Sequence, residues 1–223
     1  SPADPRGILD GVPQLLNNIK MMHTVARYYN SPERMTTLFV KISNQIITQS
    51  VEYLTPANNT SLWNEPKPEL LEKLELVVRL KEKYQEEYRA TRDRLKENPK
   101  GRQFDFDHER IFAKIELFTR RLKKLIDMFG TVQQFTTMSE VNTIDGLNGM
   151  IKRFFVIADE FKRKPYDLLD YAKNQYDRDF LEFNVNIHDL ETQLQDFVNA
   201  SFENITSTGQ ALHLLRQCQR ILP

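Results

Sequence analysis

The sequence predicts an all-α fold, an elongated stack of antiparallel helical bundles that forms part of a rod. Apolar residues recur at spacings of three and four along most of the chain, and patterns of strict alternation are almost absent. Only 7 of the 223 residues are glycine and 28% are charged, a composition that favours helices over sheets. Long helices joined by short links pack as antiparallel bundles.

Two helices are expected in the first 54 residues. The first runs over 13–29, because Pro13 suits a first helical turn. The second begins after Ser31, which can cap it, with Pro32 at its first position. The predicted buried face of the first comprises Leu15, Leu16, Ile19, Met22, Val25, Ala26 and Tyr29. That of the second comprises Met35, Leu38, Phe39, Ile42, Ile46, Val51 and Leu54.

A proline-rich loop over 55–68 separates this pair from a long helix over 68–97. The apolar positions of the long helix keep a near-heptad rhythm that is broken at Lys81 and Thr91. A narrow apolar seam with charged flanks is typical of a helix at the edge of a bundle. The seam comprises Leu70, Leu74, Val77, Tyr84, Tyr88 and Leu95.

Four further helices are expected: one that follows the entry segment 104–107 and runs to about 129, one over about 144–164, one from 178 onward and one from 206 to the end. The last one carries an apolar stripe through Leu212, Leu215 and Cys218. The first and third of these four have unbroken stripes. The stripe of the helix that ends near 129 comprises Ile111, Ile115, Phe118, Leu122, Leu125 and Phe129. The stripe of the helix from 178 onward comprises Phe180, Phe183, Ile187, Leu190, Leu194 and Phe197.

The proline-rich loop suggests a division into an N-terminal helical hairpin with its loop, 1–66, and a bundle segment, 67–223. The chain starts without methionine and stops at Leu222-Pro223. We therefore expect it to be an excerpt from a longer protein.

Several function classes find little support in the composition and motifs. The formal net charge is zero, which argues against nucleic-acid binding. No apolar run approaches the ~18 residues of a membrane span. Phosphate-binding glycine motifs are absent, and the four histidines are scattered. We expect a non-catalytic protein without cofactor or metal, and we interpret Cys218 as a small core residue. A lone cysteine also fits a reducing compartment such as the cytoplasm.

Two charged stretches leave alternatives open. A basic cluster spans 120–124, and a strongly acidic stretch spans 177–203. They are either solvated faces that complement each other across the bundle or binding faces for charged partners. Trp63, in the proline-rich loop, is either a packing plug or an interface anchor, since tryptophan is enriched among binding hot spots. The residues predicted to lie on or beside a partner surface are Trp63, Lys81, Glu82, Arg89 and Arg92.

Three blocks resemble the N-terminal tail of dynein heavy chains, most closely that of axonemal outer-arm heavy chains. They cover residues 27–45, 104–129 and 205–216, and include Arg27-Tyr28-Tyr29-Asn30-Ser31-Pro32-Glu33-Arg34. The resemblance implies a microtubule motor that hydrolyses ATP, with magnesium, in a distant ring absent here. No catalytic residue carries over. It also implies intermediate and light chains, other heavy chains, and docking or doublet-microtubule proteins as partners, in the cytoskeleton of the ciliary axoneme.

A second hypothesis is a helical tethering or coat subunit that acts at membranes. Co-sedimentation with anionic liposomes separates the two hypotheses, because clear binding would favour the membrane role.

Overall fold

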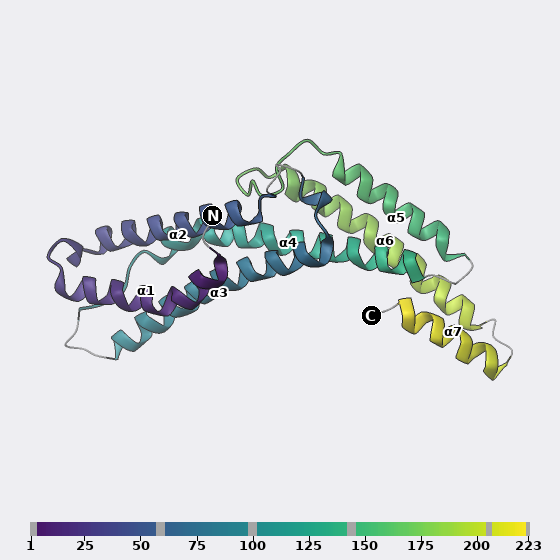
Figure 1. Ribbon diagram of the computed structural model, residues 1–223, viewed down its shortest axis with the longest axis horizontal. Coiled ribbons are helices and arrows are strands. Elements are labelled where there is room, and N and C mark those ends of the chain that lie inside the picture. The colour runs from purple at the N-terminus through teal and green to yellow at the C-terminus, as the bar shows by residue number, and fades with distance from the viewer. Residues whose placement is uncertain (1–3, 57–60, 98–101, 142–145, 204–206, 222–223) are drawn as a thin grey trace. The chain divides into compact units, whose positions relative to one another are not determined.

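The computed structural model describes residues 4–56, 61–97, 102–141, 146–203 and 207–221. The all-α prediction is confirmed: the described residues form α-helices and short 3-10 turns, with no strand among them (Figure 1). They group into two compact units, unit 1 (Ser1–Ile126) and unit 2 (Asp127–Pro223). The elements are α1 (Pro5–Val25), η1 (Tyr28–Asn30), α2 (Pro32–Leu54), η2 (Leu62–Asn64), α3 (Lys67–Lys96), α4 (His108–Val141), α5 (Leu147–Lys162), α6 (Gln175–Glu203) and α7 (Thr208–Ile221).

Unit 1 is a bundle of α1, α2, α3 and the first part of α4, with successive helices antiparallel (Figure 1). An ion pair of 3.0 Å between Arg6 and Glu72 joins the first turn of α1 to the second turn of α3. These two helices therefore run in the same direction, as the up-down-up-down topology requires. Fully buried side chains from the four helices form its core and include Val12, Leu16, Met35, Phe39, Leu74, Val77, Phe118 and Leu122.

The irregular segment 102–107, which leads into α4, closes one end of this bundle with two phenylalanines. The Phe104 ring packs edge-on against Phe39 and His23, with centroid distances of 5.8 and 5.9 Å. Phe106 lies 5.3 Å from His23, and Phe104 lies 5.8 Å from Tyr88 of α3. Side chains of α1, α2 and α3 thus share one aromatic cluster with this segment.

The predicted start of the first helix at Pro13 is wrong. The helix begins eight residues earlier at Pro5, where the Asp4 carboxylate accepts a hydrogen bond from the Arg6 backbone N–H at 3.0 Å. That N-cap and a proline at the first position are the stronger start signal, and Pro13 lies inside the helix. Val25, predicted to be buried, is 80% exposed because it lies on the face of α1 opposite the buried residues Leu16 and Ile19.

The predicted start of the second helix is confirmed. Ser31 is the N-cap, its Oγ accepts the Arg34 backbone N–H at 3.4 Å, and Pro32 takes the first position. The cap and the proline place α2 directly after the short turn that follows α1.

The expectation that the long helix lies at the edge of a bundle is wrong. α3 packs against α1 and α2, and its Tyr84 ring lies 5.5 Å from Phe112 of α4. Lys81 and Thr91, interpreted as breaks in its seam, are buried within it. Leu76, Val78 and Leu80 are buried as well, so the apolar surface of α3 is wide. Lys81 and Thr91 occupy heptad positions, and this spacing, not the polarity of the two side chains, agrees with their burial.

Unit 2 holds the remainder of α4 together with α5, α6 and α7. The rings of Phe135 and Phe154 stack at 3.9 Å and join α4 to α5. Phe161 of α5 lies 5.4 Å from Phe183 of α6. An ion pair of 2.9 Å between Arg153 and Asp189 ties the exposed edges of α5 and α6 together.

Two boundaries in this unit differ from the prediction. α4 continues twelve residues past the expected end at Phe129, because Val132, Phe135 and Met138 remain buried at a spacing of three. Gly146 is the N-cap of α5 in a left-handed conformation, with φ of 94°. That conformation suits glycine and explains the helix start at this position. Ile144, where the sequence placed the start, lies outside the described residues.

The apolar stripe predicted for the last helix is not covered in the structure. Leu212 and Leu215 of α7 are both exposed. The Cys218 side chain lies outside the described part, so its interpretation as a core residue stays a prediction. The division at residues 66 and 67 also stays a prediction about domains, whereas the two compact units divide inside α4.

Candidate interaction surface

Trp63 lies in the short η2 turn just before α3. The Ser61 Oγ accepts its backbone N–H at 3.3 Å, and its carbonyl oxygen accepts a hydrogen bond from Lys67 Nζ at 2.5 Å. The neighbouring Leu62 is buried and anchors the turn, while Trp63 itself is half-buried. The backbone of the turn is therefore held in place, and part of the Trp63 surface is available to solvent.

Lys81, predicted to point outward, is instead fully buried in the core of unit 1. Its Nζ lies 3.1 Å from the centroid of the Phe118 ring on α4 and has no hydrogen-bond partner within the described residues. Burial lowers the pKa of the Lys81 amine from 10.5 to about 6. The side chain occupies a core position of the α3 heptad, which is why its charge does not place it at the surface.

Glu82, Arg89 and Arg92 lie on the side of α3 that borders α4. Glu82 forms an ion pair of 2.7 Å with Lys123. Arg89 is exposed, and Arg92 is half-buried with its Nε 3.0 Å from Asp93. Both arginines lie near enough to His108 to lower its pKa, although burial of the imidazole is the larger cause.

The five residues do not form one patch. Trp63 precedes the first turn of α3, whereas Arg89 lies 22 residues beyond Lys67, or about 33 Å along the helix axis. Lys81 lies inside the core. What remains at the surface is a tryptophan at one end of α3 and a charged strip with Glu82, Arg89 and Arg92 along its second half.

Each of the two charged stretches finds partners on neighbouring helices. In the basic cluster, Lys123 pairs with Glu82, and Arg121 is buried. In the acidic stretch, Asp189 pairs with Arg153 of α5, and the buried Asp179 lies 3.4 Å from Lys164. These charges therefore hold helices together within their own units.

Known proteins match this chain along its whole length. A family model described as "Dynein heavy chain, N-terminal region 1" matches residues 1–223. The chain belongs to this family of dynein heavy chains. The resemblance seen in the three sequence blocks is thereby confirmed.

Curated relatives of this dynein region come from flagella and axonemes. The chain is 47% identical over 215 residues to "Dynein gamma chain, flagellar outer arm" of Chlamydomonas reinhardtii, covering 96% of this chain and 5% of that protein. It is 36% identical over 219 residues to "Dynein axonemal heavy chain 5" of Mus musculus, covering 98% of this chain and 5% of that one. It is 38% identical over 211 residues to "Dynein axonemal heavy chain 8" of Homo sapiens, covering 95% of this chain and 5% of that protein. The chain thus spans about a twentieth of these relatives.

The described part of this dynein region offers no group of three or more histidine, cysteine, aspartate or glutamate side chains placed to hold a metal ion. Among the helices that the structure describes, none combines the length and apolar character needed to cross a membrane.

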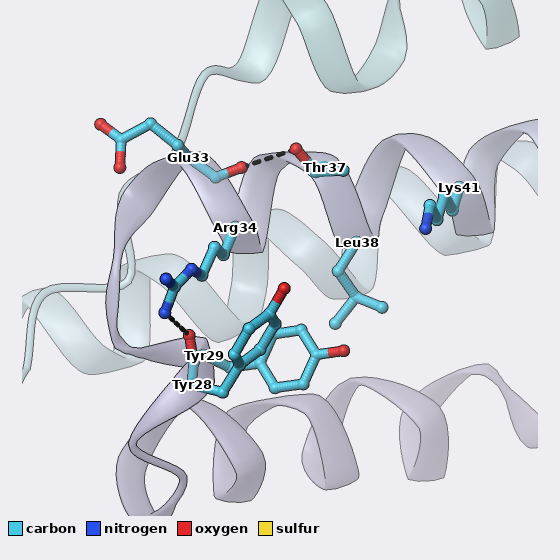
Figure 2. A pocket seen from close by; sticks show the side chains of 7 residues that line it. All are labelled: Tyr28, Tyr29, Glu33, Arg34, Thr37, Leu38 and Lys41. Carbon is cyan, nitrogen blue, oxygen red and sulfur yellow. Dashed lines mark hydrogen bonds between the residues drawn. The ribbon is translucent and has the colours of Figure 1, made fainter.

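Sequence reasoning missed one surface feature, a cavity of about 260 Å³ where α1 turns into α2 (Figure 2). It is lined by the rings of Tyr28 and Tyr29 and by outward side chains of α2, among them Arg34, Leu38 and Lys41. The residues belong to the first block that resembles dynein tails, but nothing in their spacing predicted a hollow. The α1–α2 turn brings the rings against α2, and only the three-dimensional structure shows that arrangement.

Proposed function

We propose that this chain is a non-catalytic segment of the tail of an axonemal outer-arm dynein heavy chain. It is a scaffold on which intermediate chains, light chains and sibling heavy chains assemble. Through docking or doublet-microtubule proteins it anchors the motor in the ciliary axoneme. The observation that carries the proposal is the 47% identity over nearly the whole chain to a relative named for the flagellar outer arm.

Two structural features support a scaffold role. Aromatic and aliphatic packing fixes each helical unit internally, as the clusters around Phe104 and Phe154 illustrate. Exposed charged side chains such as Arg89 then lie on rigid helices, which is the arrangement that presents a defined surface to a partner. The parent heavy chain, on this proposal, binds ATP and magnesium in a motor domain outside this chain.

The proposal is tested with a tagged heavy chain that lacks this segment, expressed in ciliated cells and purified with its complex. We expect the ratio of intermediate and light chains to heavy chain to fall at least fivefold. The ATPase rate per heavy chain should stay within twofold of the wild-type rate, which also shows that the motor is folded.

A heavy chain with Glu75→Gln, a change at an exposed position of α3, is the matched control and should retain its accessory chains. Wild-type ratios of every accessory and sibling chain in the deleted heavy chain would contradict the scaffold role.

A further inference from the structure

The turn between α1 and α2 is held in one conformation by Arg34. The Arg34 Nη1 donates a hydrogen bond to the Tyr28 carbonyl oxygen at 2.9 Å, and its guanidinium lies 4.3 Å from the centroid of the Tyr28 ring (Figure 2). The Tyr29 ring meets Tyr28 edge-on at 5.0 Å. The cavity walls are thus already ordered before any partner arrives, which lowers the entropic cost of binding.

Large apolar side chains are exposed on α1 and in the turn that follows it. Met21 and Val25 are 57% and 80% exposed and lie on the face of α1 opposite its buried residues Leu16 and Ile19, so packing within unit 1 does not account for them. Tyr28 lies in η1, after α1 has ended, and is 62% exposed. Exposed apolar side chains that gather at a cavity, here Tyr28 with Tyr29 and Leu38, are typical of a protein interaction site.

The cavity lining carries a small positive charge, although the chain as a whole is neutral. Two basic side chains, Arg34 and Lys41, and one acidic side chain, Glu33, line it. The Glu33 carboxylate points away from the tyrosine rings (Figure 2). A positive field over apolar and aromatic side chains attracts a negatively charged partner that also carries an apolar group.

Lys41 is the cation best placed to meet such a partner. It lines the cavity and is exposed, and no hydrogen bond or ion pair engages it within the described residues. Arg34, in contrast, already holds the turn. The cavity volume of about 260 Å³ accommodates one or two side chains, smaller than typical sites for drug-sized ligands.

We propose that this cavity is a docking site for an acidic segment of another polypeptide in the assembled dynein complex. An apolar side chain of that segment enters between Tyr28 and Leu38, and a neighbouring carboxylate pairs with Lys41. Aromatic and arginine side chains at the centre of such a contact are typical of binding hot spots. The inference rests on the proposed scaffold function and names the chemistry of one partner site.

The test places the photo-crosslinking residue p-benzoylphenylalanine at Tyr28 in the full-length heavy chain within the assembled complex. We expect a cross-link to a different polypeptide, within five residues of an aspartate or glutamate, at a yield at least fivefold above that of the same residue at Glu75. Glu75 is exposed on α3 and does not line the cavity. Cross-links only within the heavy chain, to lipid, to a non-acidic segment, or no excess over Glu75 would overturn the proposal.

Charge changes at Lys41 then test the ion pair. Lys41→Glu should reduce the cross-link yield at least tenfold, and Lys41→Arg should keep it within twofold. Replacing the partner's carboxylate by lysine should restore cross-linking to Lys41→Glu. Equal yields for both Lys41 variants would overturn the docking mode. A missing cross-link in a complex that retains all its accessory chains contradicts this site alone, whereas the segment deletion tests the scaffold function.

Discussion

At the scale of single residues, burial of the Lys81 amine carries an energetic cost in unit 1. A buried ammonium without hydrogen bonds loses its hydration, at a cost of several kcal/mol. The face of the Phe118 ring offsets only part of this cost, about 2 kcal/mol. Desolvation therefore dominates, in agreement with the lowered pKa of about 6, and the amine is largely neutral at pH 7.

Lys81→Met should stabilise the protein at pH 7 by roughly 1–4 kcal/mol, the range seen when buried charged groups give way to apolar side chains. The unfolded chain binds a proton at Lys81 below pH 10.5, whereas the folded chain binds it only below about pH 6. The wild type therefore gains stability as pH rises through this window, by at most about 1.4 kcal/mol per pH unit. The destabilisation that the buried Lys81 amine causes is fully present below pH 6.

Urea unfolding of the wild type and of Lys81→Met between pH 7 and pH 9 measures this pH dependence of stability. The pKa values of His23 and His108 are lowered by burial, and those of Tyr84 and Tyr88 are raised by it, so these groups titrate outside the window. The advantage of Lys81→Met should shrink as pH rises. A constant difference between the two proteins would show that Lys81 keeps its proton in the fold.

Gly146 is a second residue whose position the structure explains. A Cβ there would lie 2.9 Å from Cε2 of Phe197, and its φ of 94° strains any other residue. Gly146→Ala should cost roughly 1–3 kcal/mol in the free energy of unfolding. Gly149→Ala, inside α5 with open space around the added methyl, should instead be neutral or stabilise by up to about 1 kcal/mol. Equal effects of the two changes in thermal unfolding would contradict the strain at Gly146.

At the scale of elements, α3 has two surface features that are too far apart to bind one small epitope. Trp63→Ala and Arg89→Glu should each weaken retention of accessory chains. Because about 33 Å of helix separates them, their free-energy effects should add to within about 0.5 kcal/mol. Quantitative co-purification with singly and doubly changed heavy chains measures this. Arg79→Glu, exposed elsewhere on α3, is the control.

Coupling above about 1 kcal/mol between Trp63→Ala and Arg89→Glu would indicate one continuous partner surface. Wild-type retention in the double variant, with folding unchanged, would instead show that both features are merely solvated.

The same helix shows how far sequence reasoning reached. The spacing of Leu70, Leu74 and Val77 predicted its buried face correctly. It did not predict that Lys81 follows the heptad into the core, since charge argued for exposure. Burial of a lone lysine depends on the Phe118 ring of α4, a neighbour that periodicity does not identify. Local sequence patterns predict which face of a helix is buried, whereas the tertiary fold decides which residues of other helices contact that face.

At the scale of the whole molecule, the all-α class followed from apolar spacing, because the 3.6-residue period persists through nearly every segment. The ends of helices were less predictable. Pro13 looked like a start because Asp4 and Pro5 precede the first apolar stripe, and α4 continues past its expected end at Phe129. The cavity beside Tyr28 could not be predicted, because a turn brings its walls together.

The aromatic closure of unit 1 by segment 102–107 has a consequence for synthesis on the ribosome. Phe39 of α2 contacts Phe106, which is synthesised about 67 residues later. At ~5–20 residues per second, the ribosome needs roughly 3–13 s to add these residues. During this interval the nascent α1–α2 hairpin exposes His23 and Phe39 to solvent. The newborn chain is then most open to chaperones and to aggregation, and a ribosome that stalls before Phe104 prolongs the risk.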